Sequence, residues 1–217
     1  MKPPRPLLYL ISDRRAFRPS PETDLSQWQA QLSAIALAAQ SGCQLIQIRE
    51  KDVSARMLTT FTRAAIAAAR PWGAKVLVND RLDVALAAGA DGVHLRVNSL
   101  PATDVRRAIS RSDFLVAVST HSLAQAQAAE KAGADFIVCG PVYDTPSKRE
   151  FGAPLGLARF AEICRAVSIP VLALGGISLQ NVREPLAHGA AGVAAISLFT
   201  DRENLPAHVH QLLHTEF

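Results

Sequence analysis

Apolar and polar positions along the chain follow two periods that alternate. Short apolar runs rich in Val, Ile and Leu, typical of buried strands, are each followed by an Ala- and Leu-rich stretch whose apolar residues have helical spacing. This alternation is typical of parallel α/β proteins. The predicted strands cover residues 7–12, 45–50, 75–80, 92–96, 114–119, 136–142, 170–176 and 192–198.

A glycine recurs where a predicted helix gives way to a strand. Four of these junctions contain Gly42, Gly89, Gly133 and Gly189, which we expect to end their helices in the left-handed conformation. Eight strand–helix units close into a barrel more readily than they form an open doubly wound sheet, and the dinucleotide-binding pattern G-x-G-x-x-G does not follow the first strand. The sequence therefore predicts an α/β fold, a single (β/α)8 TIM barrel domain over residues 1–217, with residues 1–6 flexible.

Composition and charge indicate where the protein is located and which kinds of partner it binds. The apolar run at residues 7–11 is too short for a signal peptide or a membrane span, so we expect a cytoplasmic protein without a membrane partner. A net charge of +4, without a run of Lys and Arg interleaved with aromatic residues, argues against nucleic acid and favours anionic small molecules. An exterior rich in Ala and Leu is compatible with a homodimer.

Polar residues at the ends of the predicted strands are the first candidates for a site, because catalytic groups of this fold come from the carboxyl ends of strands. At the end of the second strand, alternation places Gln47, Arg49 and Lys51 on one side. Two cations pointing inward need a partner, because unpaired buried charge is costly. The pattern favours anion binding, with internal salt bridges as the alternative.

The third strand ends in oxygen donors. Asn79 and Asp80 supply an amide and a carboxylate, the hard ligands that Mg²⁺ prefers. The alternative is an Asp80 that pairs with Arg49, Lys51 or Arg81.

The next two strands end in histidines and a hydroxyl. His94 is interpreted as a satisfied core residue rather than a functional one. Ser119 and His121 lie at the end of the fifth strand, where a general base and a helix cap are both open interpretations.

The segments after the last three strands indicate a phosphate site. The stretch 140–152 contains Thr145, Ser147 and Lys148 and is too long for a plain turn, so we expect it to close on a ligand. The two strands that follow end in bare amides and hydroxyls where barrels often bind phosphate. These residues are Gly175, Gly176, Ile196 and Ser197.

Six segments, taken in order, resemble the superfamily of thiamine-phosphate synthases and thiazole tautomerases. They are residues 47–51, 78–81, 92–95, 118–122, 140–148 and 173–177, so the resemblance covers nearly the whole chain. It implies a (β/α)8 barrel that joins 4-amino-2-methyl-5-hydroxymethylpyrimidine pyrophosphate to a thiazole phosphate or its carboxylate. The products implied are thiamine phosphate and pyrophosphate, with Mg²⁺ as the cofactor.

The resemblance also implies a role for each matching residue. Arg49, Lys51 and Lys148 would stabilise the departing pyrophosphate, because convergent cations favour charge that develops in a transition state. Asp80 would bind Mg²⁺, and His121 is a candidate general acid or base. The implied substrate-binding residues are Gln47, Asn79, Ser119, Thr145, Ser147, Gly175, Gly176, Ile196 and Ser197.

One position departs from the family pattern. Synthases usually continue after Gly-Val-His-Leu with Gly-Gln and soon reach an Asp that supplies a second carboxylate for Mg²⁺, whereas this chain has Arg96 and, at the position of that Asp, Ser99. Two alternatives to a synthase follow: a thiazole tautomerase, which needs neither pyrophosphate nor Mg²⁺, and a non-catalytic protein that binds thiazole phosphate or thiamine phosphate. The Gln47, Arg49, Lys51 set and Asp80 favour the synthase.

Overall fold

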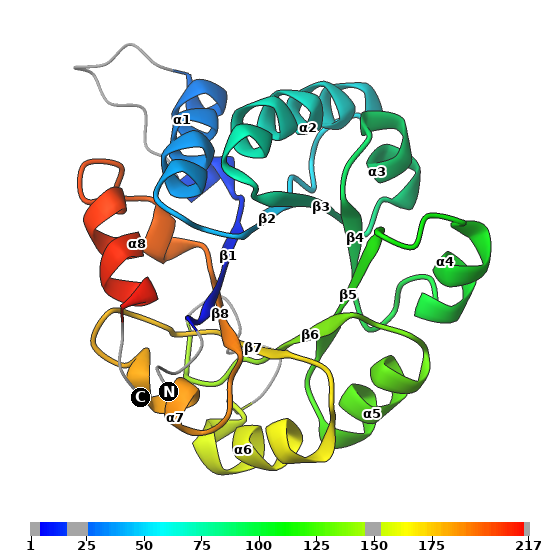
Figure 1. The fold of residues 1–217 in the computed structure, drawn as a ribbon, viewed down its shortest axis with the longest axis vertical. Coiled ribbons are helices and arrows are strands. Elements are labelled where there is room, and N and C mark those ends of the chain that lie inside the picture. Colours follow the sequence, from blue (N-terminus) through cyan, green and yellow to red (C-terminus); the bar gives the residue numbers. More distant parts are fainter. Residues whose placement is uncertain (1–4, 17–25, 146–152, 215–217) are drawn as a thin grey trace.

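The computed structural model describes residues 5–16, 26–145 and 153–214. Within these residues, eight parallel strands close into a barrel in chain order, and the helices form a ring around it (Figure 1). The predicted (β/α)8 barrel is therefore confirmed. Residues 1–4, most of the segment expected to be flexible, lie outside the described residues. The assignment of the whole chain to one domain stays a prediction.

The strands are short and regular. They are β1 Leu7–Ile11, β2 Leu45–Ile48, β3 Lys75–Asn79, β4 Gly92–Leu95, β5 Leu115–Thr120, β6 Phe136–Cys139, β7 Val171–Leu174 and β8 Gly192–Ala195. The α-helices are α1 Gln27–Gln40, α2 Ala55–Ala69, α3 Leu82–Ala88, α4 Ala102–Ala108, α5 Leu123–Lys131, α6 Gly156–Ala166, α7 Arg183–Ala187 and α8 Leu205–Leu213. Three short 3₁₀ helices, η1 Arg14–Ala16, η2 Arg70–Trp72 and η4 Ser197–Phe199, complete the described elements.

Most strands end earlier than their sequence pattern predicts. β2 ends at Ile48 rather than at residue 50, and β8 ends at Ala195 rather than at residue 198. The hydrogen-bond ladder stops there because the following backbone bonds elsewhere: the Arg49 amide donates to Ser12 Oγ at 2.8 Å, and Ser197 begins η4. Only β5 runs one residue further than predicted, to Thr120.

Strand alternation divides the apolar residues into two layers. The barrel interior is filled by Tyr9, Ile11, Leu45, Leu77, Ala117, Phe136, Val138, Leu172 and Ala194. The intervening residues, such as Leu8, Ile46 and Val76, pack against the surrounding helices. Some polar residues, including Gln47 and His94, occupy inward-facing positions of their strands. They therefore lie inside the barrel and not in the layer between the strands and the helices.

The four junction glycines have the expected backbone conformation. Gly42, Gly89, Gly133 and Gly189 have φ values of 105°, 71°, 86° and 97°. Gly89 is the C-cap of α3, and the others follow the last residue of α1, α5 and α7 by two positions. The repeated glycine thus ends a helix and turns the chain into the next strand. Among the described helices, none is long and apolar enough to cross a membrane.

Replacement of Gly192 by Ala tests the closure of the barrel. Gly192 on β8 pairs with Leu7 on β1, and an added Cβ would lie 2.0 Å from the Leu7 carbonyl oxygen. We expect Gly192→Ala to lower the free energy of unfolding by about 2–3 kcal/mol, because the two closing strands must move apart. Urea denaturation measures the change, and an unchanged midpoint would contradict this close contact.

Candidate active site

Four side chains form a polar layer at the carboxyl end of the barrel interior. Gln47 on β2 is buried, and its Nε2 donates to Asn79 Oδ1 on β3 at 3.3 Å. His94 on β4 is also buried, and its Nε2 lies 2.9 Å from Ser119 Oγ on β5. The structure thus brings together Gln47, Asn79 and Ser119, three residues that the sequence pattern assigned to one substrate. It also gives His94 a partner at the mouth of the barrel.

A buried carboxylate fixes the backbone that carries the two predicted cations. Glu50 is buried and accepts hydrogen bonds from Ser12 Oγ at 3.0 Å, Gln31 Nε2 at 2.8 Å and Arg14 Nη1 at 2.9 Å. The same Ser12 hydroxyl accepts from the Arg49 amide. Glu50 therefore links the ends of β1 and β2 to α1.

The sequence pattern did not predict this role of Glu50. Its signal is present in the chain, because the alternation of the predicted strand 45–50 would point Glu50 outward into the helix layer, where a carboxylate must be hydrogen-bonded. Arg49 is half-buried and lies near enough for its charge to affect His94. Lys51 lies in an exposed bend after β2, so strand alternation does not determine where its side chain points.

Asp80 forms an ion pair across neighbouring strand ends. It has a left-handed backbone, with φ of 61°, and its Oδ2 accepts from Arg96 Nε at 2.7 Å and from Arg96 Nη2. Burial raises the pKa of Asp80, but contacts with Ser99 and Arg96 outweigh it and leave the pKa below its ordinary value. Asp80 is therefore ionised at neutral pH.

Asp80 pairs with a cation that the sequence pattern did not suggest. Its ion pair is with Arg96, whereas Arg81 bonds Asp83 at 2.6 Å. The actual partner, Arg96, follows β4, which is hydrogen-bonded to β3. Pairing across the sheet rather than along the chain decides this contact.

The free oxygen of Asp80 fits a hard cation. Within the described residues, Asp80 Oδ1 is buried and has no hydrogen-bond partner. No group of three or more His, Cys, Asp or Glu side chains that could hold a metal occurs in that part of the chain. Mg²⁺ is commonly bound by one or two carboxylates together with water and substrate phosphates. The residues present therefore fit a cation that one carboxylate and a phosphate share.

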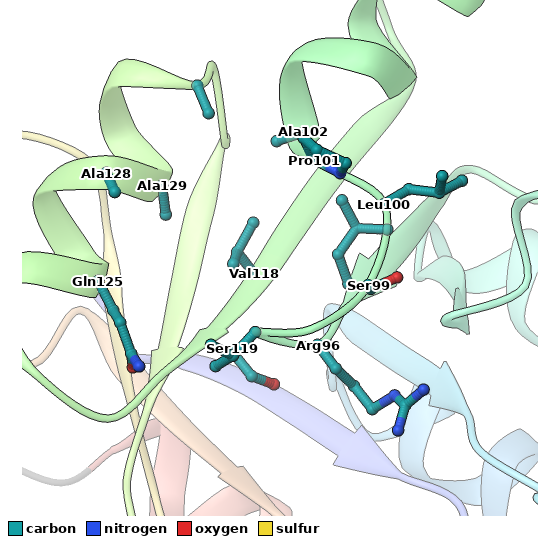
Figure 2. A pocket seen from close by; sticks show the side chains of 13 residues that line it. Arg96, Ser99, Leu100, Pro101, Ala102, Val118, Ser119, Gln125, Ala128 and Ala129 are labelled. Carbon is teal, nitrogen blue, oxygen red and sulfur yellow. The ribbon is translucent and has the colours of Figure 1, made fainter.

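A cavity of about 240 Å³ opens beside this ion pair. Figure 2 shows Arg96 and Ser119 at its barrel end, with Ala128 and Ala129 of α5 lining the helical side. Ser99 and Leu100, from the segment between β4 and α4, complete the wall near Arg96. The polar end of the cavity thus belongs to the barrel mouth, and the rest is an apolar recess between α4 and α5.

His121 is oriented by the backbone of the segment after β6. The carbonyl oxygen of Gly140 can only accept, so His121 Nδ1 donates to it and Nε2 remains as the basic ring atom. The neighbouring Ser122 is the residue that caps a helix, since its Oγ accepts from the Gln125 amide at 3.3 Å at the start of α5. The helix-cap interpretation thus applies to Ser122, and the general-base interpretation of His121 stays a prediction.

Two glycines allow the segments after β6 and β7 to touch. A Cβ on Gly175 would lie 2.5 Å from Pro141 Cβ, and one on Gly176 would lie 2.6 Å from Tyr143 Cβ. The Tyr143 amide donates to the Gly175 carbonyl at 3.1 Å. Thr145 follows in the same segment, and its buried Oγ1 has no hydrogen-bond partner among the described residues.

The remaining predicted positions lie at two places. Ile196 directly precedes Ser197, the first residue of η4, after β8. Ser147 and Lys148 lie outside the described residues, as does most of the segment 145–152 that was expected to close on a ligand.

The fold and the site together define a class of protein. A closed (β/α)8 barrel with amides, a hydroxyl and a carboxylate gathered at the carboxyl ends of its strands has the organisation of barrel enzymes. Residues 8–199 match the family model of thiamine monophosphate synthase, and the chain belongs to that family.

Individual relatives agree with the family assignment. The chain is 46% identical over 190 residues to a putative thiamine-phosphate synthase of Geobacter sulfurreducens, covering 88% of this chain and 84% of that protein. It is 40% identical over 205 residues to the thiamine-phosphate synthase of Methanoculleus marisnigri, with coverage of 94% and 92%. The solved thiamine phosphate pyrophosphorylase of Pyrococcus furiosus superposes with a TM-score of 0.80 at 31% identity, covering 95% of this chain and 93% of that one. These matches identify a transferase and give the isomerase alternative no support.

Removal of Arg96 tests its competition for Asp80. We expect Arg96→Ala to raise the affinity for Mn²⁺, a probe for Mg²⁺, by about two- to fivefold, because a partly exposed ion pair contributes up to about 1 kcal/mol. Electron paramagnetic resonance of free Mn²⁺ measures the binding. The matched control is Arg107→Ala, which removes an exposed guanidinium that pairs with Asp104 on α4. Equal affinities in both variants would show that Arg96 does not oppose the metal.

Proposed function

We propose that the protein joins 4-amino-2-methyl-5-hydroxymethylpyrimidine pyrophosphate to a thiazole phosphate, or to its carboxylate, and releases pyrophosphate and thiamine phosphate, together with carbon dioxide when the carboxylate is the substrate. The observation that carries the proposal is the polar layer of Gln47, Asn79 and Ser119 next to a carboxylate with one free oxygen. The names of the relatives, thiamine-phosphate synthase and thiamine phosphate pyrophosphorylase, support the same reaction.

The cations at the mouth stabilise the leaving group. When the carbon–oxygen bond of the pyrimidine pyrophosphate breaks, its electron pair leaves with pyrophosphate, and the pyrimidine methylene becomes a cation that the thiazole nitrogen attacks. Negative charge therefore grows on the departing oxygen, and fixed cations lower the free energy of that transition state. We assign this role to Arg49, Lys51 and Lys148. Gln47, Asn79 and Ser119 orient the pyrimidine pyrophosphate.

Magnesium is the metal that we assign to Asp80. The free Oδ1 of this carboxylate would hold it, with phosphate oxygens and water as the other ligands. Bound there, Mg²⁺ would neutralise charge on the pyrophosphate. Arg96 contributes a second positive charge at the same carboxylate, and Ser99 replaces the second carboxylate that the family pattern has at this position.

The thiazole phosphate is assigned to the opposite side of the mouth. Gly175 and Gly176 after β7 and Ile196 and Ser197 after β8 lie where barrels commonly bind phosphate with backbone amides. The hydroxyl of Thr145 supports this placement, since it is buried without a partner among the described residues and a buried hydroxyl requires a hydrogen-bond partner. Ser147 belongs to the same assignment, and His121, with Nε2 as its basic atom, is the proposed general acid or base. A cytoplasmic location and a homodimer are further proposals.

Incubation of the purified protein with both substrates, with and without Mg²⁺, tests the reaction. We expect thiamine phosphate, detected by mass spectrometry, only when Mg²⁺ is present. Asp80→Asn should lower the rate at least about a hundredfold, because it removes a charge that acts in the transition state. The matched control, Asp104→Asn, changes an exposed carboxylate on α4 and should keep the wild-type rate. Tight binding of thiazole phosphate or thiamine phosphate without any product would instead establish a non-catalytic binding protein.

A further inference from the structure

Three side chains form a continuous hydrogen-bonded row across the barrel. Tyr9 on β1 is fully buried, and its hydroxyl lies 3.2 Å from Nδ1 of His94 on β4. The other ring nitrogen, Nε2, lies 2.9 Å from Ser119 Oγ on β5. The Tyr9 and His94 rings also stack, with centroids 5.7 Å apart, and Phe136 packs edge-on against Tyr9. The imidazole is therefore held at both nitrogens and on one face.

His94 is neutral in this environment and carries one ring proton. Burial, the largest cause, and the positive charge of Arg49 together lower its pKa to about 3, although the negative charge of Asp80 acts in the opposite direction. Burial also raises the pKa of Tyr9, so the phenol keeps its proton. At neutral pH, Tyr9, His94 and Ser119 thus each carry one proton that can be donated in a hydrogen bond.

The buried Tyr9 hydroxyl determines the direction of the hydrogen bonds in this row. Among the described residues, the Tyr9 hydroxyl has a hydrogen-bond partner only in His94. If Nδ1 carried the ring proton, the Tyr9 hydrogen would lie in an apolar interior without an acceptor, which is unfavourable. Tyr9 therefore donates to Nδ1, and the ring proton is on Nε2.

The ring proton on Nε2 of His94 determines how the Ser119 hydroxyl is directed. Because Nε2–H donates to the serine oxygen, the serine hydrogen cannot be directed to His94 and is available to another acceptor. Ser119 borders the cavity at the mouth, next to Arg96 (Figure 2). A phosphate oxygen or a ring nitrogen of the pyrimidine substrate accepts hydrogen bonds and does not donate them.

We propose that Tyr9 and His94 are positioning residues that fix Ser119 as a hydrogen-bond donor to the pyrimidine pyrophosphate. The identity of that ligand rests on the proposed function, whereas the direction of the row rests only on the geometry of the barrel interior. His94 is buried with a hydrogen-bond partner at each ring nitrogen, as expected of a satisfied core residue, and the proposal adds to this a role that couples the core to the site.

The first test reads the tautomer without any substrate. The ¹⁵N shifts of histidine-labelled protein distinguish a protonated from an unprotonated ring nitrogen, and loss of one signal set in His94→Gln assigns His94 among the six histidines. We expect the Nε2–H form. An Nδ1–H form would overturn the proposal even if the protein is a synthase.

The second test compares two replacements of His94. Glutamine can accept from Tyr9 and donate to Ser119, whereas leucine has similar size and can do neither. Calorimetry with the pyrimidine pyrophosphate and Mg²⁺, without thiazole phosphate, measures the dissociation constant before any coupling occurs. We expect His94→Leu and Tyr9→Phe to weaken binding by about three- to tenfold, the effect of one hydrogen bond, and His94→Gln to stay within about twofold of the wild type.

The outcomes separate this proposal from the function on which it rests. If Ser119→Ala weakens binding but Tyr9→Phe and His94→Leu do not, Ser119 donates without the row, and the proposal is wrong. If the wild type does not bind the pyrimidine pyrophosphate, the proposed function fails, and the ¹⁵N shifts alone decide the direction of the row. Circular dichroism and denaturation curves establish that each variant is folded before its affinity is compared.

Discussion

The candidate site depends on one constraint, the alternation of side chains along eight parallel strands that close on one another. Closure leaves room inside the barrel for side chains only, so every inward residue must be apolar or hydrogen-bonded. Toward the amino ends of the strands, the inward residues are apolar, for example Leu45, Phe136 and Leu172. At the carboxyl end, Gln47 bonds Asn79 and His94 bonds Ser119. The polar layer that would bind substrate is thus also the layer that closes the core.

Two carboxylates near the mouth differ in how fully their oxygens are hydrogen-bonded within the protein. Glu50 accepts from Ser12 directly after β1, from Arg14 in η1 and from Gln31 in α1, so its hydrogen-bonding capacity is used within the protein. Asp80 has one oxygen paired with Arg96 and one oxygen that is buried without a partner among the described residues. A fully bonded carboxylate stabilises the backbone, whereas a half-bonded one can bind a cation or a ligand.

The Arg96–Asp80 pair places a positive and a negative charge at the ends of neighbouring strands. A guanidinium carries a fixed positive charge and cannot dissociate from the chain, whereas Mg²⁺ must be bound from solution. Under the proposed function, Arg96 would oppose a metal at Asp80 and would also supply positive charge where pyrophosphate is expected to lie. With Ser99 in place of a second carboxylate, Arg96 and one metal ion would share Asp80.

The sequence by itself determined the eight strands, the helix-ending glycines and the inward side of Gln47, because each follows from a period or a backbone preference within a few residues. Its motifs also indicated the family. Only the tertiary structure decided that β2 ends before Lys51, that Asp80 pairs with Arg96, and that His94 lies between Tyr9 and Ser119. These contacts join strands far apart in the chain, and they depend on register, closure and the left-handed backbone of Asp80, none of which has a local signature.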